Sequence, residues 1–103
     1  MGTLMKESLD IAAEKFKSFG FNEEQINQLL ATGKRDLEQE IEKLKTLLAE
    51  DSFNHEKINQ SLHAIKGLLY NLGNNEAGDI MAELKNNQDS SEQINKIKKT
   101  LNL

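Results

Sequence analysis

The sequence contains no cysteine, proline, tryptophan or valine, and only two histidines and one tyrosine. Without cysteine, the chain cannot form a disulfide, a thiolate zinc site or a cysteine nucleophile, and two histidines leave little for a histidine metal cluster. Proline breaks helices and valine favours strands. The absence of both, together with abundant Leu, Ile, Glu, Lys, Gln and Ala, predicts an all-α fold.

The charge balance is acidic, with 13 Lys and Arg against 17 Asp and Glu and a formal net charge of −4. A general nucleic-acid binder needs a basic face, so we expect no nucleic-acid partner. No run approaches the roughly 18 apolar residues that a membrane span needs, and the N-terminus shows no signal-peptide pattern. We therefore expect a cytoplasmic protein without membrane contact. Its 103 residues suit one domain with one modest core.

Apolar residues recur at helical spacing in five stretches of the chain. The expected helices cover residues 3–19, 23–50, 55–72, 75–85 and 91–101. The apolar positions include Phe19 in the first stretch, Leu29 in the second and Ile80 in the fourth. Gly33 lies inside the second stretch, but the apolar pattern keeps its phase there, which predicts one continuous helix. Short connections make neighbouring helices antiparallel, so the predicted fold is an antiparallel up-down four-helix bundle with an additional N-terminal helix packed across it.

Capping residues mark the ends of these stretches. Gly20 and Gly73 follow the last apolar residues of the first and third stretches, as glycine commonly does just beyond a helix. The predicted N-terminal caps are Asn22 with Gln25 in a capping box, Asn54, and Ser90 with Gln93 in a second capping box.

The third predicted helix has a second face that does not belong to its apolar stripe. The stripe consists of Ile58, Leu62, Ile65, Leu69 and Leu72, all within about 40° on a helical wheel. His63, Gly67 and Tyr70 fall together on the side away from the stripe, and Lys66 lies beside them. A glycine inside a helix costs about 1 kcal/mol relative to alanine, and a solvent-facing position does not require it. Clearance for an approaching protein would explain Gly67.

This face combines an exposed nucleophile, a cation and a gap for a partner. Lys66 is the helical neighbour of His63 at three residues' distance, so its charge can reach a group held on the imidazole. An unprotonated imidazole nitrogen is a nucleophile near neutral pH, and the lysine offsets arriving negative charge. The arrangement therefore suits transfer of a phosphoryl group to and from His63.

These residues belong to the segment HAIKGLLYNLG, which runs from His63 to Gly73. The segment resembles the signature of histidine-containing phosphotransfer (HPt) domains. In that family a His-x-x-Lys-Gly stretch is followed, six residues after the first glycine, by a second glycine that closes the helix. The next segment, 74–85, resembles the family's short return helix.

The resemblance implies one HPt-like domain over residues 1–103, whose four-helix bundle passes phosphoryl groups between the aspartates of receiver domains in a multistep phosphorelay. His63 matches the phosphoacceptor, Lys66 the cation beside the phosphate, and Gly73 the residue that closes the helix. The surface on which a receiver docks is expected to include Gly67, which gives it access, and also Tyr70, Asn59 and Leu68.

The resemblance also implies a phosphocarrier rather than an enzyme. The chain would bind no cofactor or metal itself, because Mg²⁺ and the acidic pocket belong to the partner receiver. The partners would be receiver domains of response regulators or hybrid histidine kinases, and the carrier would be a monomer. Where the family has small residues after Lys-Gly, this chain has Leu68 and Leu69. We expect the neighbouring helix to leave more room for Leu69, and Leu68 either to pack or to extend an apolar docking surface.

Other classes of function remain. The alternative is a helical-bundle adaptor that binds a receiver domain or a partner helix without phosphorylation, which the apolar spacing over 26–48 would serve equally well. A hydrolase or metal site is disfavoured because His55 and His63 are eight residues apart, about 12 Å along a helix, and no paired carboxylate or Gly-rich loop accompanies them. DNA binding would rest only on the lysines of 96–99, which are better explained as complements to a helix dipole.

Overall fold

The computed structural model describes residues 2–50, 54–86 and 90–101, and every element in these ranges is a helix. The helices are α1 (Gly2–Ser18), α2 (Glu23–Leu48), α3 (His55–Asn71), α4 (Asn75–Asn86) and α5 (Ser90–Leu101). The all-α prediction is confirmed, and each helix begins and ends within two residues of its expected position. None of the five is both long and apolar enough to span a membrane. The predicted turns at 51–53 and 87–89 lie outside the described residues.

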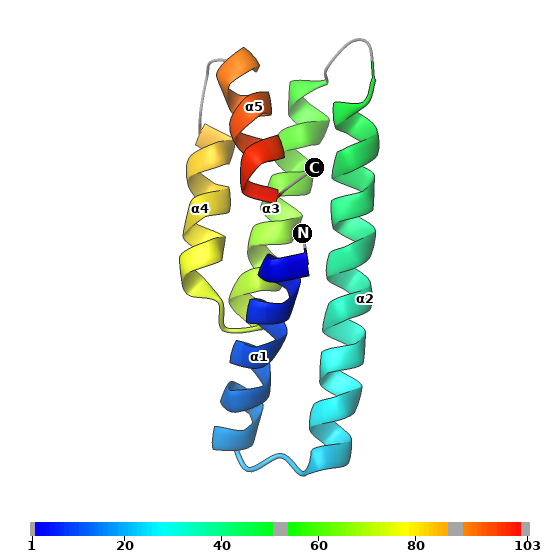
Figure 1. Cartoon of the computed structure of the whole chain (residues 1–103), viewed down its shortest axis with the longest axis vertical. Coiled ribbons are helices and arrows are strands. Elements are labelled where there is room, and N and C mark those ends of the chain that lie inside the picture. The colour runs from blue at the N-terminus through cyan, green and yellow to red at the C-terminus, as the bar shows by residue number, and fades with distance from the viewer. Residues whose placement is uncertain (1, 51–53, 87–89, 102–103) are drawn as a thin grey trace.

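The helices lie along one long axis, in an elongated molecule of 46 × 21 × 20 Å (Figure 1). The longest helix, α2, runs upward in this view; α3 returns beside it, α4 runs upward again next to α3, and α5 descends from the far end of α4. The shorter α1 lies beside the lower half of α2. Successive helices from α2 to α5 therefore run in opposite directions.

Local caps explain where the helices begin and end. Asn22 and Gln25 form the predicted capping box: the Asn22 side chain accepts from the Gln25 N–H at 2.8 Å, and the Gln25 side chain accepts from the Asn22 N–H at 3.0 Å. Asn54 caps α3 as predicted, by accepting from the backbone N–H three residues later. Gly20 and Gly73, after α1 and α3, have φ values of +85° and +90°, which favour glycine.

The second predicted capping box is not described, because the side chain of Ser90 lies outside the described residues. The Gln93 side chain makes other contacts. It is buried, and its Nε2 donates to the Leu84 carbonyl at 2.8 Å and to Asn59 Oδ1 at 3.1 Å. Gln93 therefore fastens α5 to the end of α4 and to α3.

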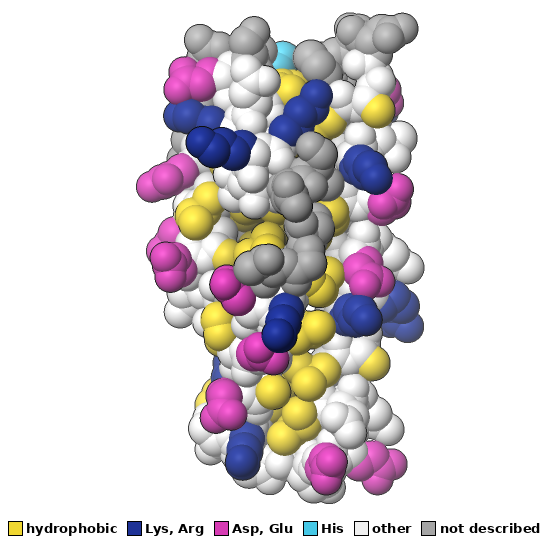
Figure 2. Space-filling model, in the orientation of Figure 1, with side chains coloured by type: hydrophobic (Ala, Val, Ile, Leu, Met, Phe, Trp, Pro, Cys, Tyr) yellow, Lys and Arg dark blue, Asp and Glu magenta, His cyan; other side chains and the backbone are white. Residues whose placement is uncertain are grey.

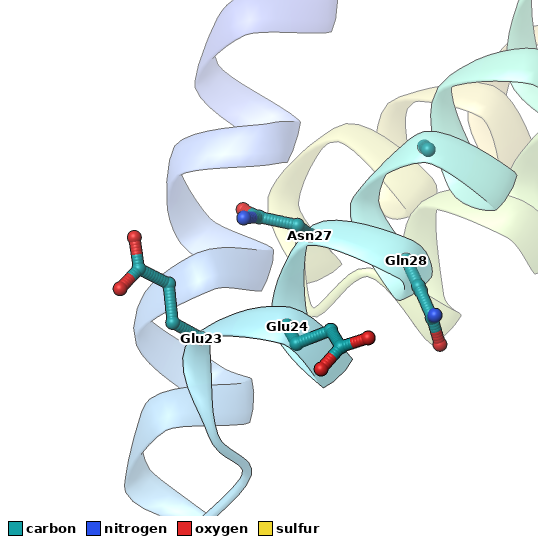
Figure 3. A pocket seen from close by; sticks show the side chains of 5 residues that line it. Glu23, Glu24, Asn27 and Gln28 are labelled. Atoms are coloured by element: carbon teal, nitrogen blue, oxygen red, sulfur yellow. The ribbon is translucent and has the colours of Figure 1, made fainter.

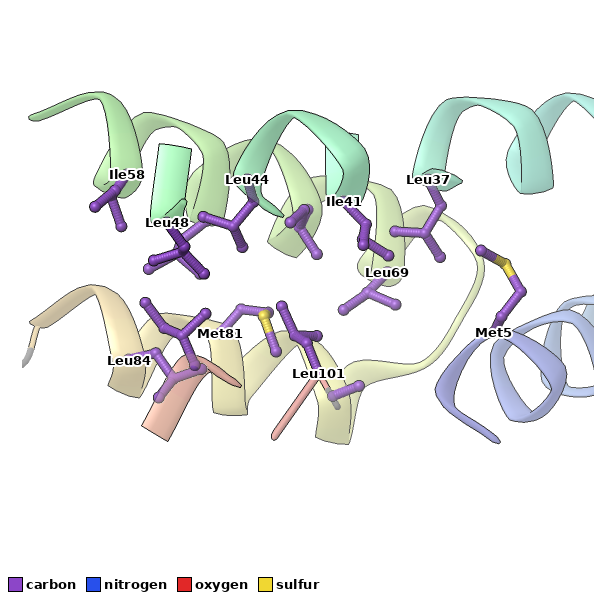
Figure 4. Close-up of a cluster of buried hydrophobic side chains, with 14 of the residues drawn as sticks. Met5, Leu37, Ile41, Leu44, Leu48, Ile58, Leu69, Met81, Leu84 and Leu101 are labelled. Atoms are coloured by element: carbon purple, nitrogen blue, oxygen red, sulfur yellow. The ribbon is translucent and has the colours of Figure 1, made fainter. Parts of the chain in front are cut away.

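The core lies between α2 and α3 on one side and α4 and α5 on the other, as Figure 4 shows for a cluster of its side chains. The predicted stripe of α3 is buried in full: Ile58, Leu62, Ile65, Leu69 and Leu72. Leu37 and Leu44 of α2, Met81 of α4 and Leu101 of α5 belong to the same cluster. In contrast to its predicted place in the apolar stripe of α4, Ile80 is exposed. Burial of the α3 stripe fixes the rotation of this helix, and thus the direction of its opposite face.

The helix α2 continues through Gly33, as the phase of its apolar pattern predicted. The structure adds a reason for glycine at this position. An ideal Cβ on Gly33 would lie 2.8 Å from Leu72 Cδ2, which is closer than carbon atoms pack. The glycine thus allows α2 and the C-terminal end of α3 to approach each other closely.

Apolar side chains at the end of the molecule formed by α1 and α2 are more exposed than the apolar pattern of the sequence predicted. Phe19 is 64% exposed and Leu29 is 39% exposed. Because Gly33 lies next to Leu72 at the end of α3, the first turns of α2 project beyond α3 and have α1 beside them instead. Phe21 contacts the rings of Phe16 and Phe19 edge to face, at centroid distances of 6.0 and 6.5 Å. Figure 2 shows hydrophobic side chains gathered between α1 and α2 in the lower half of the view.

The additional helix α1 is fastened to the connection between α3 and α4. Asn74 is buried, and its Nδ2 donates to Ser8 Oγ at 2.9 Å, while its Oδ1 accepts from the Ala77 N–H at 3.2 Å. Lys15 Nζ donates to the Asn71 carbonyl at 3.1 Å, at the C-terminal end of α3. These contacts hold α1 at the end of the α3–α4 hairpin.

Candidate functional site around His63

His63 lies on the exposed side of α3, as predicted. Its neighbours Leu62 and Ile65 are fully buried, and this packing turns the His63 side chain outward. The imidazole is therefore accessible on a helix whose orientation is fixed by the core.

Two hollows flank His63, one on each side of α3. The α2-side hollow is lined by Asp36, Gln39 and Glu40 of α2 and by His63, Ala64, Gly67, Leu68 and Asn71 of α3. The α4-side hollow is lined by Glu56, Asn59, Gln60 and His63 of α3 and by Lys85 of α4. Since His63 lines both hollows, a group attached to its ring can enter either of them.

Gly67 is not required by packing within the part of the chain that the structure describes. Apart from the adjacent residues and the backbone of its own helix, no described atom lies within 4 Å of an ideal Cβ on Gly67, whereas one on Gly33 would collide with Leu72 and one on Gly78 with Tyr70. Gly67 also lacks the positive φ that would otherwise favour glycine. The described residues therefore give no internal reason for glycine at this position, and its role in giving a partner access stays a prediction.

Lys66 is half-buried and follows His63 by three residues on the same helix. This spacing places the two side chains next to each other on the helix surface. Within residues 2–50, 54–86 and 90–101, neither ion pair involves Lys66. The structure thus brings His63, Lys66 and Gly67 together on one face, as the sequence predicted.

Tyr70 lies differently from its predicted position. The helical wheel placed it on the outward face beside His63, but the side chain is half-buried against α4. Its ring packs directly on Gly78, and its hydroxyl donates to Asp79 Oδ1 at 2.6 Å. The hydrogen bond to Asp79 raises the pKa of Tyr70 above its usual value, because the neutral hydroxyl is the donor, and partial burial adds to the shift. Tyr70 thus connects α3 to α4, and its role in docking stays a prediction.

Exchanging Gly78 for alanine is expected to destabilise the protein. The new methyl group would lie 2.6 Å from Tyr70 Cδ1, so the ring or α4 must shift. Overpacking of this kind costs about 1–3 kcal/mol, against a gain in helix propensity of about 1 kcal/mol. Denaturant unfolding measures the difference, and the pKa of Tyr70 should fall as the Asp79 contact is lost.

Gly67→Ala is the matched control for this variant. The same methyl group enters open space on the neighbouring helix, so we expect the free energy of unfolding to rise by up to about 1 kcal/mol. If Gly67→Ala and Gly78→Ala change the free energy of unfolding equally, the two glycines do not differ in packing and this prediction is wrong.

The remaining predicted docking residues have structural contacts as well. Asn59 is half-buried and accepts the hydrogen bond from Gln93. Leu68 is half-buried against the core and also lines the α2-side hollow, so it both packs and contributes apolar surface. Leu69 is fully buried.

Sequence reasoning missed the residues that other helices add to the site. Asp36 and Glu40 come from α2 and Lys85 from α4, so no local spacing connects them with His63. A signal for Lys85 does exist. In the predicted α3–α4 hairpin, His63 is 10 residues before Gly73 and Lys85 is 12 residues after it, which places them at nearly the same level.

The described residues contain no group of three or more His, Asp or Glu side chains that could hold a metal ion. A further hollow lies at the start of α2 and is lined by Glu23, Glu24, Asn27, Gln28 and Ala31. Figure 3 shows that its labelled side chains point in different directions and do not converge on a common point.

Lys66 and Lys85 supply positive charge near His63, the two hollows supply space beside it, and Gly67 supplies clearance. These features suit a group with negative charge that is held on the imidazole and is reached by a large partner. Comparison of the chain with family models, with curated proteins and with solved structures finds no match.

Proposed function

We propose that the protein is a histidine phosphotransfer protein, which accepts a phosphoryl group on His63 from one receiver domain and passes it to another. The main support is the open position of Gly67, one turn after an exposed histidine on a helix whose other face is fully packed. An internal glycine that its own fold does not need is explained by a partner that must approach His63 closely. The resemblance of the segment 63–73 to the HPt signature supports the same function.

The proposed fold is the four-helix bundle of that family. In this arrangement α2, α3, α4 and α5 form the bundle, and α1 is the additional N-terminal helix. Their alternating directions and shared core support the assignment. The bundle serves as a rigid support that presents His63, and the carrier acts as a cytoplasmic monomer.

The chemical step is a direct transfer between two side chains. An unprotonated nitrogen of His63 forms a bond to phosphorus while the bond from phosphorus to the receiver's aspartyl oxygen breaks, and the carboxylate leaves with the electron pair. The receiver supplies Mg²⁺ and the acidic pocket that holds it, so the carrier needs only a nucleophile and compensating charge. Lys66 offsets the negative charge that arrives on the ring. Transfer to a second receiver reverses these steps.

Incubation with a phosphorylated receiver domain tests this proposal. Receivers from the same genome are labelled on their aspartate with a radioactive acyl phosphate donor and mixed with the full chain. We expect label to move to the protein and to be lost in acid, as a phosphohistidine requires. If no receiver transfers label to the folded protein, the phosphocarrier proposal is wrong.

The second candidate function is an adaptor that binds a receiver or a partner helix without phosphorylation. The exposed apolar side chains at the α1–α2 end, including Phe19 and Leu29, favour this alternative. An adaptor would bind its partner equally well when His63 cannot be phosphorylated. Binding without any acid-labile phosphate on the chain would therefore select the adaptor.

A further inference from the structure

The α4-side hollow contains a cation that the proposed transfer step does not yet use. Lys85 lines this hollow together with His63, and it comes from α4 rather than α3. We propose that Lys85 is a second phosphoryl-binding cation, which draws the phosphoryl group on His63 into the α4-side hollow. The inference rests on the proposed function, because it specifies where the transferred group lies and which residues hold it.

The level of Lys85 along the α3–α4 hairpin supports this assignment. The two helices run in opposite directions from the connection at Gly73 (Figure 1). His63 is 10 residues before Gly73 and Lys85 is 12 residues after it, a difference of two residues or about 3 Å of helix rise. Lys85 is half-buried, so part of its side chain is held against the protein. It therefore lies across the hollow from His63 and not elsewhere along α4.

A buried hydrogen-bonded side chain holds both walls of the hollow. Gln93 of α5 is only 2% exposed, and its Nε2 donates to the carbonyl of Leu84 and to Asn59 Oδ1. Leu84 precedes Lys85 in α4, and Asn59 lies one helical turn before His63 in α3. Since Gln93 donates to Oδ1 of Asn59, this bond does not use the Nδ2 donor of Asn59, and an amide N–H suits a phosphoryl oxygen.

The charges around His63 favour the α4 side over the α2 side. Asp36 and Glu40 line the α2-side hollow and would repel a phosphoryl dianion, although Arg35 Nε lies 3.6 Å from Asp36 Oδ1 and offsets part of that charge. The α4-side hollow contains one carboxylate, Glu56, but this residue is seven positions before His63, about 10.5 Å along the helix. Lys85 balances Glu56 in charge, so the lining of the α4-side hollow is neutral, whereas that of the α2-side hollow carries two carboxylates and no cation.

Chemical phosphorylation with phosphoramidate tests the inference without any receiver. An unprotonated His63 nitrogen forms the new bond to phosphorus, the nitrogen–phosphorus bond of phosphoramidate breaks, and ammonia leaves with that electron pair. The phosphorus NMR shift is then followed against pH to obtain the second pKa of the phosphoryl group. A cation at about 4 Å in water lowers such a pKa by roughly 0.7 of a unit, and by more where solvent is partly excluded.

Three variants of the full chain give the comparison. In Lys85→Gln we expect the phosphoryl pKa to rise by about 0.7 of a unit or more relative to the wild type. In Lys85→Arg, which keeps the charge, we expect it to stay near the wild-type value. Lys43→Gln is the matched control, because this exposed lysine of α2 lines neither hollow and its loss changes the net charge equally. Circular dichroism verifies that each variant is helical.

Equal phosphoryl pKa values in the wild type and Lys85→Gln would overturn the inference, as would an equal rise in Lys43→Gln. If Lys85→Gln does not fold, Lys85→Arg decides instead. A phosphoryl pKa in Lys85→Arg equal to that of the wild type would support the inference. A phosphoryl pKa equal to that of free phosphohistidine would overturn the inference. Failure of phosphoramidate to label His63 in the wild type would also overturn it, because the hollow would then not admit the group. None of these results depends on a receiver, so failure of receiver transfer is a separate outcome that concerns only the proposed function.

Discussion

Replacement of His63 with glutamine is expected to abolish uptake of phosphate from a phosphorylated receiver and to leave the fold intact. Glutamine is polar and of similar reach but has no nucleophilic ring nitrogen, so no bond to phosphorus can form. Because the His63 side chain is exposed on the surface of α3, its replacement should change the free energy of unfolding by no more than about 0.5 kcal/mol. Radiolabel transfer and denaturant unfolding on the same preparation measure the two quantities.

His55→Gln is the matched control for this experiment. His55 is the other histidine of the chain and is exposed at the first position of α3, eight residues before His63. The chemical change is identical, and we expect transfer at the wild-type rate. Label on the His63→Gln variant, or its loss from His55→Gln, would contradict the assignment of His63 as the phosphoacceptor.

The helices could be predicted from the sequence because their signals are local. A cap such as Asn22 or Asn54 bonds to the backbone only three residues away, so residue type and spacing are sufficient to identify it. The continuity of α2 through Gly33 followed from the phase of one apolar stripe. These signals need no knowledge of which helix lies next to which.

Burial at the α1–α2 end depended on information that the sequence does not display. Phe19 and Leu29 repeat at helical spacing as core residues do, and their exposure results from where α3 ends relative to α2. The end of α3 lies next to α2 where Leu72 approaches Gly33, and these two residues are 39 positions apart in the chain. A periodic pattern predicts which side of a helix is apolar but not how far along that side a partner extends.

Some residues of the candidate site could likewise be placed from the sequence, and others could not. His63, Lys66 and Gly67 share one turn of one helix, so a wheel places them correctly once the buried stripe is known. Tyr70 was placed by its angle alone, and its long side chain instead reaches α4, where Gly78 leaves room for the ring and Asp79 accepts from the hydroxyl. The wheel cannot represent a side chain that leans toward a neighbouring helix.

The most informative variant after His63→Gln is Gly67→Leu, which we expect to slow phosphoryl transfer without weakening the fold. The side chain would enter the α2-side hollow beside His63, where an ideal Cβ meets no described atom within 4 Å other than those of the adjacent residues and its own helix backbone. Leucine also removes the cost of glycine in a helix, about 1 kcal/mol, so stability should not fall. At a closely packed docking surface the added bulk costs about 1–3 kcal/mol, which corresponds to roughly a 5- to 150-fold loss of transfer rate at limiting protein concentration.

Two controls separate blocked docking from other causes. Ala31→Leu adds similar bulk to an exposed position of α2, five residues and about 7.5 Å along the helix from Asp36, where the α2-side hollow begins. Its transfer rate should match that of the wild type. Phosphoramidate is small enough to reach His63 past a leucine, so chemical phosphorylation of Gly67→Leu should proceed almost normally. A variant that is slow with the receiver and normal with phosphoramidate has lost access for a protein, not its nucleophile. A normal rate with the receiver would instead mean that Gly67 gives no clearance, and the main structural support for a docked partner would be lost.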